Sequence, residues 1–166
     1  LWSLQVMRET PDLVRQVHEA FIDAGARIIT LNTYTATPSR LGRDGAPDEF
    51  KRLQKQAHDI ASAARDSTGC PHGPVQVAGC LPPLVSSYRA DTVPSEASCR
   101  KQYAAIVAAQ PDVDLFICET LSTVAEARYA AESALESGKP VLLSVTIKDD
   151  GSSVLRSGEK VESLIG

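Results

Sequence analysis

Four apolar runs, each separated from the next by a stretch with helical periodicity, constrain the fold of this chain most. The runs are ARIITLNTYTATP (26–38), PVQVAGCL (74–81), VDLFICET (113–120) and KPVLLSVTI (139–147). Runs that are apolar almost throughout are typical of strands covered by helices in a parallel sheet. The alternation therefore predicts an α/β fold that begins with a helix, repeats strand and helix three times, and ends on a strand.

The expected helices carry recognisable end signals. In TPDLVRQVHEAFIDAG, Thr10 can cap the helix, Pro11 suits its first position and Gly25 can end it in a left-handed turn. Its apolar stripe at helical spacing consists of Leu13, Val14, Val17, Phe21 and Ile22. Further helices are expected over about 49–65, 96–109 and 123–136, the last with Thr123 and Glu126 spaced as a capping box. A polar loop is expected over 39–49, and a new helix start at the end.

Two architectures fit this order: an open doubly wound sheet and a (β/α)8 barrel. A doubly wound sheet that binds nucleotides carries a Gly-rich phosphate loop. The corresponding stretch AGCLPPL has one glycine, and its prolines remove the amides that would hold a phosphate. The chain begins with Leu1 rather than Met and stops inside an apparent helix start. Both features favour part of a barrel, about strands two to five with their helices.

Composition narrows the class of partner. The chain has 166 residues, a formal net charge of -4 and 43% hydrophobic residues, which is typical of one globular domain. Mild acidity without a basic stripe argues against nucleic acid or an anionic membrane as a partner. No run reaches transmembrane length, and no signal peptide is recognisable. Four widely spaced cysteines (Cys70, Cys80, Cys99 and Cys118) predict reduced, structural thiols and a cytoplasmic protein.

Polar side chains follow the strands, at the end of a parallel sheet where sites form. They are Asn32, Thr33 and Tyr34 after the first run, Glu119 and Thr120 after the third, and Ser144 to Thr146 in the fourth. A half-buried carboxylate such as Glu119 needs a cationic or multiply donating partner. The alternatives are that Glu119 is an exposed acid at a helix N-terminus and that Asn32 and Thr33 serve only a turn.

Four blocks together resemble the homocysteine S-methyltransferase family, which includes betaine–homocysteine methyltransferase and the homocysteine-binding module of cobalamin-dependent methionine synthase. The blocks are TPDLVRQVHEAFIDAGARIITLNTYTATPSRL, VAGCLPPLVSSYRAD, DLFICETLSTVAEARYA and KPVLLSVTIKDDGSSVLRSGEKV. The resemblance implies a zinc-dependent (β/α)8 barrel that transfers a methyl group from a small donor to the thiol of homocysteine, giving methionine. It also implies that Glu119 binds the ammonium group of homocysteine and that Asn32, Thr33 and Tyr34 line the same mouth.

The sequence departs from the family pattern in what it lacks. An Asp-Gly-Gly-type motif of the family's first strand, a Gly-x-Asn-Cys block and a Cys-Cys pair have no match in residues 1–166, and Cys80 stands where the family commonly has serine. The expected reading is a partial homocysteine-binding barrel without its first strand, its zinc ligands or a metal site of its own, inactive alone but active within its parent.

Two alternatives remain. The first is a zinc-less, degenerate barrel or half-barrel that binds an amino acid. The second is an unrelated aldolase- or hydrolase-type barrel, which needs a lysine or a His/Asp cluster at a strand end. The nearest lysine, Lys148, lies beyond the fourth run.

Overall fold

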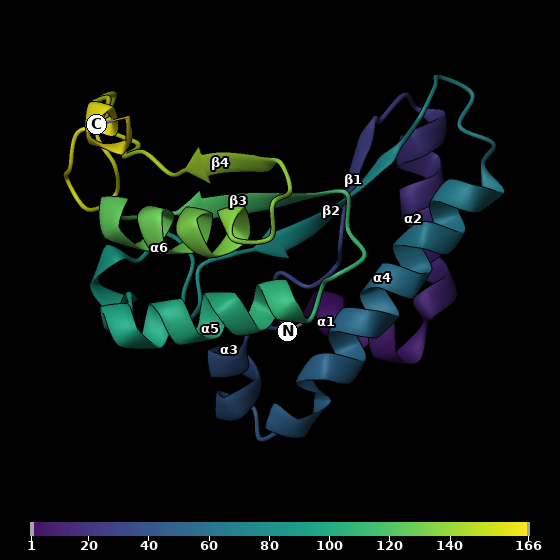
Figure 1. The fold of residues 1–166 in the computed structure, drawn as a ribbon, viewed down its shortest axis with the longest axis horizontal. Helices are drawn as coiled ribbons and strands as arrows, with labels where there is room; N and C mark the ends of the chain where they lie inside the picture. Colours follow the sequence, from purple (N-terminus) through teal and green to yellow (C-terminus); the bar gives the residue numbers. More distant parts are fainter. Residues whose placement is uncertain (1, 166) are drawn as a thin grey trace.

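The computed structural model describes residues 2–165, which form one parallel sheet of four strands flanked by helices (Figure 1). The strands are β1 (Ile28–Thr30), β2 (Gln76–Leu81), β3 (Leu115–Leu121) and β4 (Val141–Val145), and they are neighbours in that order. Every adjacent pair is parallel. The predicted α/β fold is confirmed, and each predicted apolar run contains one strand.

Six α-helices accompany the sheet. They are α1 (Trp2–Glu9), α2 (Pro11–Asp23), α3 (Pro38–Arg43), α4 (Phe50–Ser67), α5 (Glu96–Ala108) and α6 (Val124–Leu135), with short 3-10 helices at Pro47–Glu49, Ala90–Thr92 and Val161–Leu164. The sequence reading missed α1 and placed a loop where α3 lies. Helix α3 forms because Pro38 stands at its start and the Thr37 hydroxyl accepts a hydrogen bond from the backbone N–H of Arg40 at 3.2 Å.

The strand order distinguishes the two architectures left open by the sequence. A doubly wound sheet reverses its strand order at a switch point, whereas here four strands follow one another without reversal. Right-handed crossovers between successive neighbours place the connecting helices on one face. Figure 1 shows α2 beside α4 at one end of the sheet and α5 beside α6 at the other. This is the arrangement of consecutive units of a (β/α)8 barrel.

The core lies between the sheet and these helices. Its largest fully buried side chains include Tyr103, Ile106, Phe116 and Leu121, which come from α5 and β3. Helix α4 contributes a buried stripe that is mostly alanine, so it packs close to the sheet. Together these residues bury a continuous apolar cluster beneath all four strands.

The apolar stripe of α2 is covered over only part of its width. Val14 and Ile22 are buried, but Leu13, Val17 and Phe21 are exposed, Phe21 by 62%. These exposed side chains lie beside β1, which has no neighbour on its outer edge among the described residues. The opposite edge strand β4 is similarly open, with Leu142 and Leu143 exposed.

Two predicted helix caps behave differently. Thr123 caps α6, since its hydroxyl accepts a hydrogen bond from the backbone N–H of Glu126 at 3.0 Å. Glu126 does not complete the capping box, because its carboxyl Oε1 lies 3.2 Å from the Tyr103 hydroxyl instead. Thr10 makes no cap bond, because its hydroxyl donates to the Val6 carbonyl at the end of α1. No helix within residues 2–165 combines the length and apolar character needed to cross a membrane.

Candidate functional site

The carboxyl ends of the strands form a rim, and side-chain alternation decides which residues point away from the helices. A Cβ added at Gly79 in β2 would point toward the helix layer. It would lie 2.5 Å from Phe116 in β3 and would also contact Gln110. The next residue along, Cys80, therefore points to the opposite face. Glu119 shares that face, since it follows the buried, helix-facing Cys118.

Glu119 and Cys80 meet at this rim. The Cys80 thiol donates a hydrogen bond to Glu119 Oε1, with the sulfur and the oxygen 3.3 Å apart. Cys80 is buried, whereas Glu119 is half-buried and faces outward from the sheet. No lysine or arginine of residues 2–165 lies within ion-pair distance of Glu119. Its carboxylate thus has a hydrogen-bond donor beside it but no cation.

Glu119 does not act as the acid at the N-terminus of α6. That position belongs to Glu159, whose Oε2 accepts a hydrogen bond from the backbone N–H of Val124 at 3.0 Å. The helix amides are thus satisfied by Glu159 and by the Thr123 cap. The alternative reading of Glu119 as an exposed helix acid does not describe this geometry.

The backbone of β3 is irregular where Glu119 leaves the strand. The pairing of β3 with β4 shifts register between Cys118 and Leu121. Thr120 lies in the left-handed region with a φ of 64°, which β-branched residues rarely adopt. Such strained residues concentrate at functional sites, and a bulge commonly re-aims a neighbouring side chain. The local backbone is therefore arranged around the direction of the Glu119 side chain.

The structure disperses the three polar residues that follow β1. Asn32 Nδ2 donates to the Ser3 carbonyl at 3.1 Å, which ties it to α1. Thr33 is buried, and its hydroxyl lies 3.5 Å from Gln110 Nε2. The Tyr34 hydroxyl lies 2.7 Å from the Ser87 hydroxyl, in the loop after β2. Of the three, Thr33 is connected to Cys80, because Gln110 donates to the Thr33 hydroxyl through Nε2 and accepts from the Cys80 backbone N–H through Oε1.

A buried amide connects this pair to the core. Gln110, which follows α5, accepts a hydrogen bond from the backbone N–H of Cys80 at 3.1 Å. Its Nε2 donates to Gln54 Oε1 in α4 at 2.7 Å. Both glutamine side chains are buried, so their orientations are fixed by these bonds. The end of β2 is thereby held in place through a network that reaches two helices.

The loop after β2 is held by side-chain donors. Its three consecutive carbonyls, those of Pro82, Pro83 and Leu84, accept hydrogen bonds from Tyr103 Oη (3.1 Å), Arg40 Nη2 (2.9 Å) and Thr37 Oγ1 (2.7 Å) respectively. All three donors are buried. This proline-rich loop is therefore a fixed wall of the rim.

The two carboxyl groups of this region lie in different environments. Glu126 is buried behind the loop, and burial raises the pKa of its carboxyl above the ordinary value. Burial also raises the pKa of its partner Tyr103 well above the ordinary value. Glu126 is thus a structural group that packs against the loop, while Glu119 is the carboxylate presented at the rim.

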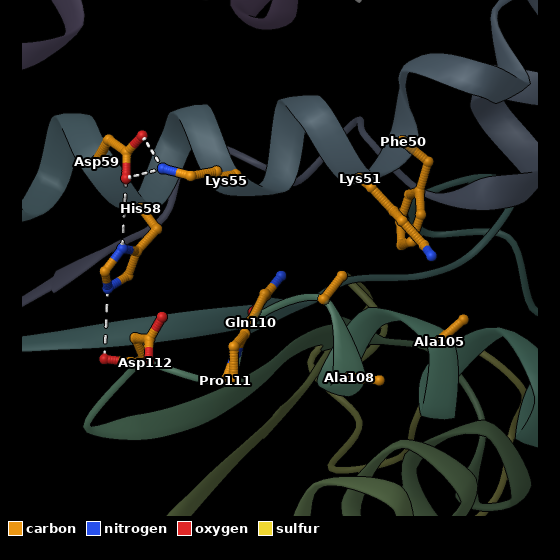
Figure 2. Close-up of a pocket in the computed structure, with 11 residues that line it drawn as sticks. Phe50, Lys51, Lys55, His58, Asp59, Ala105, Ala108, Gln110, Pro111 and Asp112 are labelled. Carbon is orange, nitrogen blue, oxygen red and sulfur yellow. Dashed lines mark hydrogen bonds and ion pairs between the residues drawn. The ribbon is translucent and has the colours of Figure 1, made fainter.

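A hollow of about 590 Å³ lies on the helix side of the molecule, between α4 and α5 (Figure 2). Lys55 and Asp59, which line it, form an ion pair at 2.6 Å, and His58 Nε2 lies 3.3 Å from the Asp112 carbonyl. Lys55, Asp59 and His58 thus already have partners within this part of the protein. Gln110, labelled in Figure 2, lines this hollow and is also the residue that contacts Cys80.

The four thiols are free and do not cluster. Cys118 is buried in β3 as strand packing, as predicted, and burial raises the pKa of its thiol to about 12. Within residues 2–165, no three His, Cys, Asp or Glu side chains are placed to hold a metal ion together. The rim thus offers a carboxylate and a thiol donor, a combination suited to holding a cationic group.

Comparison with known proteins decides the family. The family model described as homocysteine S-methyltransferase matches residues 1–166. The chain belongs to the homocysteine S-methyltransferase family. It is 31% identical over 144 residues to the homocysteine S-methyltransferase of Escherichia coli K12, which covers 80% of this chain and 46% of that protein. It is 30% identical over 152 residues to S-methylmethionine–homocysteine S-methyltransferase of Pongo abelii, covering 91% and 39% respectively.

A solved structure of a family member has the same fold as this chain. The metallated form of the homocysteine methyltransferase MmuM from Escherichia coli superposes with a TM-score of 0.87 at 28% identity. The superposition covers 99% of this chain and 61% of MmuM. The expected family and the expected fold, part of a (β/α)8 barrel, are both confirmed. The chain spans less than half the length of these and other curated relatives.

Sequence reasoning did not assign a role at the rim to Cys80 or Gln110. Cys80 was interpreted as a small buried hydrophobe, which describes its burial but not its contact with Glu119. One signal was available: in neighbouring parallel strands, residues that end both strands lie at the same edge. Gln110 carried no such signal, because its position depends on how α5 ends against β2.

Proposed function

We propose that this chain forms the part of a homocysteine S-methyltransferase that holds the ammonium group of homocysteine through Glu119. The observation that carries the proposal is a strand-end carboxylate without a cationic partner among the described residues, in a chain of this family. A carboxylate that accepts hydrogen bonds from an ammonium group is a charge-assisted pair, stronger than a neutral one. Thr33 shares the partner Gln110 with Cys80, which contacts Glu119. Asn32 and Tyr34 are proposed to line the periphery of the same binding site.

The proposed reaction is methyl transfer to sulfur. The homocysteine sulfur attacks the electrophilic methyl group of a donor, a new carbon–sulfur bond forms, and the bond between that methyl and the donor breaks. The thiol proton is lost, so the products are methionine and the demethylated donor. The thiolate is the reactive nucleophile. By binding the ammonium group of homocysteine, Glu119 would restrict the positions of the homocysteine sulfur relative to the methyl donor.

Zinc dependence is a prediction for the full-length protein. The family resemblance implies zinc held by cysteine blocks that have no match in this sequence, and zinc would supply a thiolate near neutral pH. The described residues do not fit a zinc site, since they bring no three ligand side chains together. We therefore derive no step through the metal. A partial barrel over residues 1–166, and a cytoplasmic location, likewise stay predictions.

The test is methionine formation by the full-length protein. Homocysteine is supplied with S-methylmethionine, betaine or S-adenosylmethionine as methyl donor, and methionine is measured by mass spectrometry. Glu119→Gln should lower kcat/KM for homocysteine by about 10- to 100-fold, because a charge-assisted pair is lost. The exposed Glu136, which directly follows α6, provides a matched control, and Glu136→Gln should leave kcat/KM unchanged.

Two outcomes would contradict the proposal. Absence of methionine with every donor, despite homocysteine binding, would favour the alternative of an amino-acid-binding module without transferase activity. Equal kcat/KM for Glu119→Gln and wild type would remove Glu119 from the binding site even if the protein is an active methyltransferase.

A further inference from the structure

The contact between Cys80 and Glu119 is set by two neighbouring strands. Cys80 in β2 is paired with Ile117 in β3, so Glu119 lies two residues further along the same face. The Cys80 sulfur reaches Glu119 Oε1 at 3.3 Å, which is a normal distance for a thiol donor. The contact therefore joins a buried strand residue to the Glu119 carboxylate at the rim.

The Cys80 thiol is suited to donate and not to ionise. Burial, together with the negative charge of Glu119, raises the pKa of this thiol well above its ordinary value. The thiol therefore keeps its proton and can share it with the carboxylate oxygen. Its position is also fixed, since the Cys80 backbone N–H donates to Gln110 Oε1 and Gln110 is anchored to Gln54.

Glu119 depends on this donor more than a surface carboxylate would. Among the side chains described over residues 3–165, the Cys80 thiol supplies the one side-chain hydrogen bond that Glu119 accepts. The adjoining backbone holds Thr120 in the left-handed region, and β3 shifts its register against β4 there. The second carboxylate oxygen, Oε2, accepts no hydrogen bond from these residues, which leaves it available to a ligand.

We propose that Cys80 is a positioning residue that orients the Glu119 carboxylate toward the ammonium group of homocysteine. The proposal rests on the proposed function, because it takes Glu119 as the ammonium-binding group. Cys80 itself contacts Glu119 and not the sulfur of the substrate. The thiol occupies Oε1 and holds the plane of the carboxylate, and the ammonium group binds at Oε2.

The experiment compares two ligands by isothermal titration calorimetry on the full-length protein. The ligands are homocysteine and 4-sulfanylbutanoate, which is homocysteine without its amino group. Cys80→Ala removes the donor and should weaken homocysteine binding about 3- to 10-fold, the loss expected for one hydrogen bond. It should leave 4-sulfanylbutanoate binding unchanged, because that ligand has no ammonium group for Glu119 to hold.

Three further variants complete the design. Cys80→Ser restores a donor and should bind homocysteine within about twofold of wild type. Cys80→Ala combined with Glu119→Gln should bind no more weakly than Glu119→Gln alone, since the two residues act as one unit. Cys99→Ala removes another buried thiol, which bonds the Pro94 carbonyl away from the rim, and should not alter either affinity.

The outcomes separate this proposal from the proposed function. Weaker homocysteine binding by Glu119→Gln with wild-type binding by Cys80→Ala would overturn the role of Cys80 and leave Glu119 in place. Equal loss of both ligands in Cys80→Ala would also overturn it, because the change would then be a general distortion. If Cys80→Ala does not fold, Cys80→Val, which fills the space without a donor, takes its place. If Glu119→Gln leaves homocysteine affinity unchanged, the proposed function itself fails.

Discussion

Replacing Gly79 with alanine should destabilise the protein more than the same change at the other glycines of residues 2–165. An added Cβ would lie 2.5 Å from Phe116 Cδ1 and would overlap Gln110 Oε1. Phe116 is fully buried, so it cannot move into solvent. Overpacking of this kind costs about 1–3 kcal/mol. Displacing Gln110 would leave the buried N–H of Cys80 without its acceptor, at about 1–3 kcal/mol.

Together these effects predict a loss of about 2–6 kcal/mol, against a total stability of roughly 5–15 kcal/mol for a typical domain. Urea unfolding followed by circular dichroism would measure it, as a fall in the midpoint of about 1–3 M. Gly42→Ala is the matched control, because its Cβ would meet no atom within 4 Å. Gly42 lies in helix α3, where alanine should stabilise by about 0.5–1 kcal/mol.

The reasoning is refuted if Gly79→Ala unfolds at the same urea concentration as wild type. Such a result would mean that β2 and β3 can separate without cost, and the close approach of Gly79 to Phe116 would have no energetic meaning. A loss of equal size in Gly42→Ala would also refute it, because the effect would then not depend on packing at the sheet.

Three other predictions concern single groups. Glu126 has a folded-state pKa above its ordinary value of 4.5, so its contribution to stability is fully present below that pH and is lost as the pH rises through the folded-state pKa. Glu126→Gln cannot ionise, so its free energy of unfolding relative to wild type should rise as the pH increases above 4.5; a constant difference would contradict the assignment. Thr120→Gly should raise the free energy of unfolding by about 1 kcal/mol, because glycine adopts a positive φ without strain, while homocysteine binds more weakly through a less constrained Glu119. Iodoacetamide followed by mass spectrometry should modify the partly exposed Cys70 before the buried Cys118, since burial raises the pKa of Cys118 to about 12; labelling of Cys118 as early as Cys70 would mean that β3 opens.

The sequence predicted the strands and the principal helices because their signals are local. An apolar run, a proline at a helix start or a glycine such as Gly25, with a φ of 104°, acts through its immediate neighbours. The predicted helix over 49–65 forms at Phe50–Ser67 and the predicted strand 113–120 forms at Leu115–Leu121. Helix α3 was missed because Gly42 and Gly45 suggested a loop, whereas the Thr37 cap outweighs that preference.

The arrangement of the rim was less predictable because it depends on register. Glu119 could be singled out from its place after a strand, but its thiol partner belongs to another strand 39 residues earlier in the chain. Asn32 and Tyr34 have separate partners, Ser3 and Ser87, which no spacing in the sequence indicates. The exposed side chains of the α2 apolar stripe were equally unpredictable from the sequence. Helical periodicity identifies the apolar face of a helix but not how much of that face packs against the sheet.

The central claim is that Glu119 binds the ammonium group of homocysteine, and a crystal structure of the full-length protein with homocysteine tests it most directly. The account predicts the ammonium nitrogen within about 2.7–2.9 Å of a Glu119 carboxylate oxygen, with the Cys80 thiol still bonded to the other oxygen. A complex in which the ammonium group is held elsewhere, and Glu119 faces only water, would contradict it.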